Sequence, residues 1–121
     1  MINNYQKLFK MRKKQLLAHN PDMEKKYNCA GVYSISINEQ LVYIGKAKNM
    51  LKRVIEHILC TEYNYPVENK YIVLKDANSN HHKIQFDVMY YATSTNPIEI
   101  EREIGEKEGE LIRQYLPALN Y

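Results

Sequence analysis

Three polar side chains repeat at four-residue intervals between residues 49 and 57, namely Asn49, Arg53 and His57. On a helix this spacing places all three along one ridge. Lys46 comes just before this segment. Lysine, arginine and histidine would therefore converge near the N-terminal end of a helix, where the helix dipole also favours anions. Such a group of donors would suit a phosphate.

Two tyrosines, Tyr33 and Tyr43, lie in alternating apolar segments that flank the short polar stretch Asn38-Glu39-Gln40. This pattern predicts a β-hairpin. A three-residue turn, which we expect here, places both tyrosines on one face of the hairpin. A two-residue turn would place them on opposite faces unless a β-bulge resets the register.

One carboxylate lies within the apolar stripe of a predicted C-terminal helix. Glu108 is four residues from both Ile104 and Ile112, so it should share their face, where a carboxylate is costly unless it is paired or bound to a metal. Gly105 and Gly109 flank it, which suggests the close approach of a backbone or ligand. The rest of the stripe is Ile100, Leu111 and Tyr115, and Glu101, Glu103, Glu106 and Glu110 should point more outward.

Several elements must position these side chains. We expect a basic helix over 3–19 that ends at Asn20-Pro21, the hairpin, and a helix over 48–60 with a buried stripe. A strand should follow over 83–92, with Ile84, Phe86, Val88 and Tyr90 on one side, and then a helix from Pro97 to near Pro117. Segment 61–82 is ambiguous, because residues 67–74 fit a helix or a strand. This order predicts an α+β fold, a small three-stranded antiparallel sheet flanked by helices, plus the basic N-terminal helix.

Length and composition limit the protein class. The chain of 121 residues is 45% apolar and 26% charged, as expected for one folded domain. Its longest apolar run, 88–92, cannot span a membrane, and the N-terminus lacks the apolar core of a secretory signal. We therefore expect a cytoplasmic protein. Its two cysteines form no recognisable disulfide or zinc pattern.

Charge is unevenly distributed along the chain. The formal net charge is only +3, but residues 1–29 hold seven Lys or Arg and two acids, whereas residues 99–110 hold six Glu and two basic residues. A further basic run lies in residues 46–53. Two basic regions and an acidic helix suit a protein that binds phosphate and also needs a carboxylate for a metal.

Gly31-Val32-Tyr33 and Tyr43-Ile44-Gly45, whose tyrosines are ten residues apart, resemble the paired motifs of the GIY-YIG nuclease family. The residues from Lys46 through Arg53 to His57 continue the similarity, most closely to the nuclease domain of the nucleotide-excision-repair incision subunit. Glu108 and Asn120, twelve residues apart, resemble the final carboxylate and asparagine of the family. The similarity covers residues 30–121, and residues 1–29 form a basic extension outside it.

The resemblance implies a metal-dependent phosphodiesterase that cleaves DNA at a single site. Glu108 would hold Mg²⁺ or Mn²⁺, while Arg53 and Lys46 would offset charge on the phosphate. Tyr33, Tyr43 and His57 are the candidate general bases, of which we favour Tyr33 assisted by His57. A phenol has a pKa near 10 and needs neighbouring cations to act as a base. Expected positioning residues are Gly31, Gly45, Asn49 and Asn120, and expected contacts to the DNA backbone are Lys10, Lys13, Lys14, Lys48 and Lys52.

The sequence is compatible with several alternatives. The chain could be a catalytically silent nucleic-acid-binding module with the same fold, although every expected catalytic residue is present. RNA could replace DNA as the substrate. Specificity could come from DNA structure or from a partner protein, and a double-strand break would need two visits or a homodimer. The N-terminal helix could contact phosphates or brace the domain.

Overall fold

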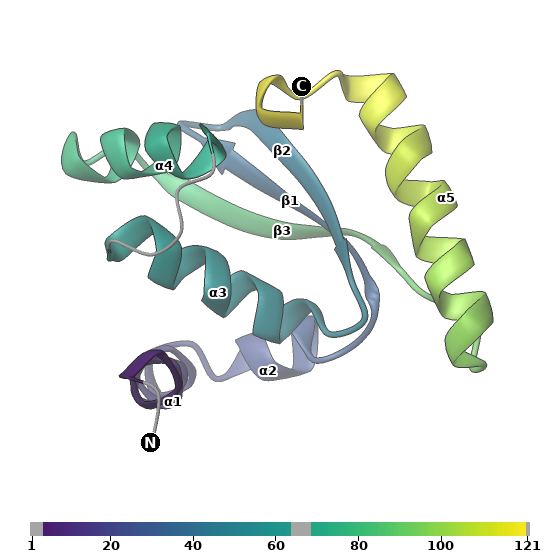
Figure 1. Ribbon diagram of the computed structural model, residues 1–121, viewed down its shortest axis with the longest axis horizontal. Helices are drawn as coiled ribbons and strands as arrows, with labels where there is room; N and C mark the ends of the chain where they lie inside the picture. The colour runs from purple at the N-terminus through teal and green to yellow at the C-terminus, as the bar shows by residue number, and fades with distance from the viewer. Residues whose placement is uncertain (1–3, 64–68, 121) are drawn as a thin grey trace.

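The computed structural model describes residues 4–63 and 69–120 (Figure 1). Its elements show an α+β fold, as predicted. They are α1 (Asn4–His19), α2 (Asp22–Tyr27), β1 (Gly31–Ile37), β2 (Gln40–Ala47), α3 (Met50–Glu62), α4 (Asn69–Ser79), β3 (Ile84–Tyr91), α5 (Pro97–Tyr115) and a 3-10 turn, η1 (Ala118–Asn120).

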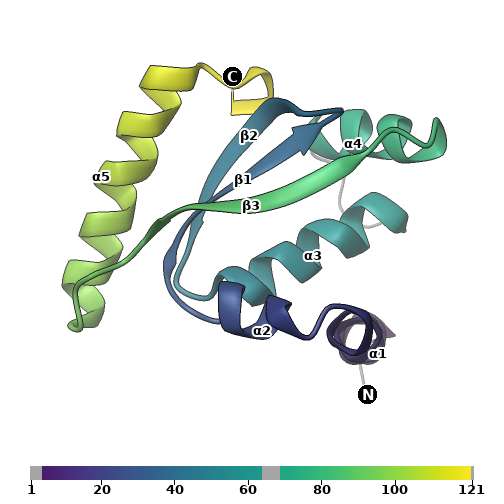
Figure 2. The ribbon, with the colours of Figure 1, turned by 180° about the vertical axis from the view of Figure 1, so that it is seen from behind.

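The three strands form one antiparallel sheet in the order β2-β1-β3, so β1 is central. Figures 1 and 2 show α5 on one face of the sheet and α3, with α1 and α2, on the other. Each face buries its own apolar cluster. The larger contains Tyr33, Ile35 and much of α3, and the smaller contains Val32, Ile44, Ile104 and Leu111. A central strand buried on both sides explains why β1 has almost no exposed residue.

The hairpin turn has two residues, not the three that we predicted. Asn38 and Glu39 both adopt left-handed backbone angles, with φ of 48° and 70°, which matches the twist of a two-residue hairpin turn. The register then shifts between Ile35 and Ser36, so that Ile35 pairs with Tyr43. This bulge resets the alternation and places Tyr33 and Tyr43 on the same face of the sheet after all.

A second register shift corrects our prediction for β3. It occurs between Val32 and Tyr33 on β1, where Val32 pairs with Tyr90 and Tyr33 pairs with Val88. Because one residue of β3 is skipped, Tyr90 turns to the α5 face, whereas Ile84, Phe86 and Val88 pack on the α3 face. We predicted that these four residues share one face of the strand, and this prediction was wrong for Tyr90.

The ambiguous segment 61–82 contains the helix α4, which buries Tyr71, Leu74 and Ala77. Residues 64–68 of this segment lie outside the described residues. In α5, Asn96 caps the first turn by accepting a hydrogen bond from Ile98 N–H at 2.9 Å. The predicted stripe on α5 was wrong at Tyr115, which is 50% exposed because the helix has passed the edge of the sheet contact.

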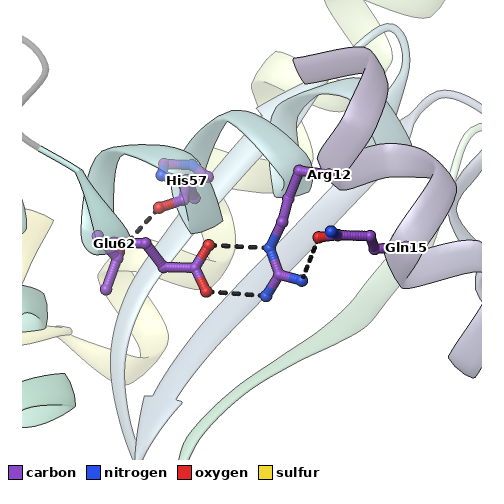
Figure 3. Close-up of polar contacts among 5 residues, drawn as sticks. Arg12, Gln15, His57 and Glu62 are labelled. Carbon is purple, nitrogen blue, oxygen red and sulfur yellow. Dashed lines mark hydrogen bonds and ion pairs between the residues drawn. The ribbon is translucent and has the colours of Figure 1, made fainter. Parts of the chain in front are cut away.

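The N-terminal helix α1 packs on the domain through its apolar side chains. Tyr5, Leu8, Phe9 and Leu16 contact the larger cluster. Arg12 holds α1 to the end of α3 with two hydrogen bonds to the Glu62 carboxylate, at 2.9 and 2.8 Å (Figure 3).

Among the described residues, no helix has the length and apolarity needed to cross a membrane.

Candidate active site

Tyr33 and His57 form the centre of the candidate site. The Tyr33 hydroxyl lies 2.6 Å from Nε2 of His57, across the interface between β1 and α3. Both side chains are almost fully buried, at 1% and 0% exposure. The spacing of residues 49, 53 and 57 correctly predicted a shared helix, but His57 points into the core and not along the surface ridge.

Tyr43 approaches the same pair from β2. Its ring centroid lies 6.4 Å from that of Tyr33 and 5.7 Å from that of His57. Gly45 makes this approach possible, because a Cβ there would lie 2.6 Å from Cζ of Tyr33, closer still to its hydroxyl oxygen, and 2.9 Å from Cε2 of Tyr43. Only glycine leaves room for both rings at this point of β2.

Arg53 lies one helical turn before His57, and its positive charge acts on the Tyr33 hydroxyl, whose pKa it lowers. It also lies 3.9 Å from the Glu56 carboxylate. Burial would lower the pKa of Arg53, yet its pKa lies above the ordinary value because Tyr33, Tyr71 and Glu56 favour the charged form. Arg53 is thus a permanent cation beside the buried phenol.

Burial sets the resting protonation states of this pair. It raises the pKa of Tyr33 far above the ordinary value, with the Tyr43 phenol adding to the rise, and the Arg53 cation only partly opposes it. Burial also lowers the pKa of His57 well below its usual range, with Arg53 and Lys70 lowering it further. The resting site therefore contains a neutral phenol and a neutral imidazole.

The structure adds two residues that sequence reasoning missed. Tyr71 on α4 places its hydroxyl 2.9 Å from Nδ1 of His57. The ammonium of Lys70 lies 4.8 Å from the Tyr43 ring centroid and 5.1 Å from that of Tyr71. We call Tyr33, Tyr43, His57 and Tyr71 the ring cluster. No sequence signal identified Tyr71, because it lies in the segment whose secondary structure was ambiguous.

Glu108 lies on the other side of β2, where α5 passes the strand. Its carboxylate lies near the ammonium and the backbone N–H of Lys46, both of which favour its ionised form. Burial raises the pKa of Glu108, and the Lys46 charge and N–H partly oppose the rise. Strand β2 lies between Glu108 and the ring cluster. Gly45 of this strand is next to Tyr33, and the following residue, Lys46, is near Glu108. Adjacent residues of a strand point to opposite faces of the sheet, which explains why these neighbours face different groups.

The glycines beside Glu108 contact flexible cations, not a second backbone. A Cβ at Gly105 would meet Nζ of Lys46 at 3.2 Å, and one at Gly109 would meet Nη1 of Arg113 at 3.2 Å. Lys46 therefore lies along α5 close to the Glu108 turn. Lys46 and Glu108 thus lie near each other where α5 passes β2.

A divalent ion is compatible with this donor set. Within residues 4–63 and 69–120, no group of three or more His, Cys, Asp or Glu residues could enclose a metal. Glu108 offers a single, partly desolvated carboxylate, which suits Mg²⁺ because that ion keeps several waters and binds through one or two carboxylates and substrate phosphates. A protein-enclosed site such as structural zinc does not fit.

The expected positioning residues hold the backbone around the site. Asn120 accepts a hydrogen bond from Ile44 N–H and donates one to Ile44 C=O, both at 2.8 Å, which fixes η1 to β2. Asn49 caps α3 by accepting from Lys52 N–H at 3.0 Å, and it also donates to Asn28. A Cβ at Gly31 would lie 2.8 Å from the Met50 side chain, so α3 packs closely on the start of β1.

The basic residues expected at DNA lie in separate places. Lys10 and Lys52 line a groove of about 490 Å³ between α1 and α3, together with Tyr5 and Phe9. Lys13 and Lys52 line a smaller neighbouring groove. Lys14 is exposed on α1, whereas Lys48 lies 3.4 Å from the Glu101 carboxylate of α5.

Three solved structures are similar to this chain in fold. The GIY-YIG N-terminal endonuclease domain of UvrC from Thermotoga maritima, bound to magnesium, is 22% identical, with a TM-score of 0.54 over 84% of this chain and 93% of that chain. A point mutant of that domain bound to its catalytic divalent cation is 21% identical, with a TM-score of 0.55 and the same coverage. A bacteriophage T4 EndoII mutant is 27% identical, with a TM-score of 0.53 over 79% and 75%. The chain has the GIY-YIG nuclease fold.

The GIY-YIG resemblance expected from the sequence is thus confirmed at the level of fold. Its two motifs occupy the start of β1 and the end of β2, where the sheet register brings Tyr33 opposite Gly45. No protein-family model and no curated protein matches the chain.

Proposed function

We propose that this protein is a divalent-metal-dependent endonuclease that hydrolyses phosphodiester bonds in DNA. The observation that carries the proposal is the 2.6 Å hydrogen bond between Tyr33 and His57 beside the Arg53 cation. A phenol paired with a base and next to a permanent cation is suited to activate water at a phosphate. The GIY-YIG fold of solved endonucleases supports the same reaction class.

Tyr33 is the proposed general base. Its resting pKa is too high for it to exist as phenolate, so it would take a proton from water as its own hydroxyl proton passes to Nε2 of His57. The Arg53 guanidinium would stabilise negative charge that develops on the phenol oxygen and on the phosphate. Tyr43, across the cluster from Tyr33, would position the water or phosphate.

Glu108 is the proposed ligand of Mg²⁺ or Mn²⁺. Bound there, the ion would polarise the scissile phosphate and stabilise the leaving oxygen. Lys46 would offset further charge on the phosphate oxygens. The Lys46 charge and backbone N–H would also favour the ionised form of Glu108 that binds a cation.

Basic side chains on α1 and α3 are proposed to bind the DNA backbone. Lys10, Lys13 and Lys52 line adjoining grooves, and contacts of this kind raise affinity without reading bases. In this proposal residues 1–29 both brace the domain and extend the binding surface, while residues 30–121 carry the catalytic groups. One such site cuts one strand, so a double-strand break requires two visits or a second copy, and specificity is set by DNA structure or by a partner protein.

Cleavage of labelled substrates tests the proposal. We expect the purified protein with Mg²⁺ or Mn²⁺ to nick plasmid or to cut single-stranded, duplex or branched DNA, and EDTA to stop the reaction. Glu108→Ala should retain DNA while losing cleavage. Equal behaviour of the two proteins, with binding but no cleavage, would favour the catalytically silent module. Cutting confined to matched RNA substrates would replace DNA by RNA in the proposal.

A further inference from the structure

Tyr71 contacts the catalytic histidine from outside the two GIY-YIG motifs. Each ring nitrogen of His57 has a tyrosine hydroxyl as its partner: Nε2 contacts Tyr33 at 2.6 Å and Nδ1 contacts Tyr71 at 2.9 Å. His57 is 0% exposed and Tyr71 is 3% exposed. No water is needed to satisfy the ring, and the three side chains form a continuous chain from α4 to β1.

A neutral imidazole has one donor nitrogen and one acceptor nitrogen. In the proposed reaction the Tyr33 O–H donates to Nε2 of His57, 2.6 Å away. The nearby Arg53 cation favours this orientation because it attracts the lone pairs of the Tyr33 oxygen and repels the hydroxyl proton. Nε2 is then the acceptor, so Nδ1 carries a proton and donates a hydrogen bond to the Tyr71 oxygen, 2.9 Å away. In the opposite tautomer Nε2 already carries a proton and cannot receive the one from Tyr33.

We propose that Tyr71 is a positioning residue that accepts the Nδ1–H of His57 and thereby holds the tautomer whose Nε2 can receive the Tyr33 proton. This assignment rests on the proposed nuclease function and deepens it. The step is a proton transfer: the Tyr33 O–H bond breaks, an Nε2–H bond forms, and the imidazolium charge is stabilised through Nδ1–H by Tyr71. In other hydrolases a third residue similarly orients the catalytic base that activates the nucleophile.

The placement of α4 supports this role. Lys70, next to Tyr71, lies over the rings of both Tyr43 and Tyr71 at 4.8 and 5.1 Å. Tyr71 and Leu74 are buried in the same cluster as Tyr33. The first turns of α4 are therefore packed onto the catalytic face of the sheet, and the Tyr71 hydroxyl is held by its surroundings rather than by His57 alone.

Nitrogen NMR of protein labelled with ¹⁵N-histidine tests the tautomer without any cleavage assay. The chain has four histidines, and His19, His81 and His82 are exposed, so a His57→Asn spectrum assigns the buried ring. We expect Nδ1 of His57 to be protonated and Nε2 to be an acceptor. Tyr71→Phe should remove this preference, and Tyr91→Phe should not. Tyr91 is a matched control because its hydroxyl donates to the Lys26 carbonyl at 2.9 Å, away from the ring cluster.

Single-turnover cleavage supplies the second measurement. Tyr71→Phe should lower the single-turnover rate constant by at least about tenfold, which is part of the roughly 10²–10⁴-fold that a general base contributes, and leave the half-saturating DNA concentration unchanged. A wild-type spectrum with Nε2 protonated would overturn the proposal, as would a Tyr71→Phe variant with the wild-type rate constant. An inactive wild type with the expected tautomer would refute the nuclease function while leaving the Tyr71–His57 assignment intact.

Discussion

Replacing Gly45 by alanine should displace the Tyr33 ring. The new Cβ would lie 2.6 Å from Cζ of Tyr33 and 2.9 Å from Cε2 of Tyr43. Carbon atoms in contact normally lie about 3.5–4.0 Å apart, so the Tyr33 ring must move by about 1 Å. Tyr33 is only 1% exposed, and overfilling a buried site of this kind costs about 1–3 kcal/mol of unfolding free energy.

The same displacement should slow cleavage. A misplacement of about 1 Å in a catalytic group can reduce the rate about 100-fold, which corresponds to about 2.7 kcal/mol of transition-state stabilisation. Urea unfolding measures the first effect. Single-turnover nicking of supercoiled plasmid, at a temperature well below the unfolding midpoint of Gly45→Ala, measures the second.

Gly109→Ala is the matched control for stability. Its Cβ would meet the mobile end of Arg113 at 3.2 Å, and alanine is favoured over glycine inside a helix by about 1 kcal/mol. This variant should be at least as stable as the wild type. A Gly45→Ala protein that is equally stable and nicks at the wild-type rate would refute the inferred packing of Tyr33 against Gly45.

Two further predictions concern single side chains whose hydrogen bonds connect different secondary-structure elements. Asn120→Ala should lower the unfolding free energy by about 1–3 kcal/mol in urea denaturation, because it removes both hydrogen bonds to the backbone of Ile44; an unchanged midpoint would contradict this role. The pKa of Glu103 lies far below its ordinary value of 4.5, chiefly because the Tyr90 hydroxyl and then the N–H groups of Ser94 and Thr93 donate to it. A lowered folded-state pKa stabilises the protein above the unfolded-state pKa, and this contribution disappears as the pH falls below about 4.5. The urea midpoint of Glu103→Gln should therefore fall less than that of the wild type between about pH 6 and about pH 3, and parallel curves would contradict the assignment.

Local sequence patterns predicted most of the fold because they depend on neighbouring residues. Alternation identified the hairpin, and the helical period identified α3 and α5. The turn length was wrong, because Asn38 and Glu39 both adopt left-handed angles although the sequence has no glycine there to indicate such a turn. The bulge that restores the alignment of Tyr33 and Tyr43 depends on packing across the sheet, which no local pattern encodes.

The candidate site was less predictable where tertiary contacts determine the position of a side chain. The four-residue spacing placed Arg53 and His57 on one helix, but the depth of His57 depends on how α3 and α4 cover the sheet. Tyr71 was missed because it lies in the segment 61–82, whose hydrophobic pattern shows no clear helical or strand periodicity. Glu103 was expected to point outward, yet it accepts hydrogen bonds from Tyr90 and Thr93 because α5 crosses the end of β3.

Tyr33 and Glu108 lie on opposite sides of β2, yet the proposed reaction requires both. The most direct test compares Tyr33→Phe, Glu108→Gln and the double variant in single-turnover nicking with Mg²⁺, after thermal melts show that each is folded. Groups that act as one catalytic unit have strongly non-additive effects. We predict that each single change slows nicking by at least about 100-fold and that the double variant is about as slow as the slower single one. Rate losses that multiply, or a single variant that nicks at the wild-type rate, would contradict a shared active site.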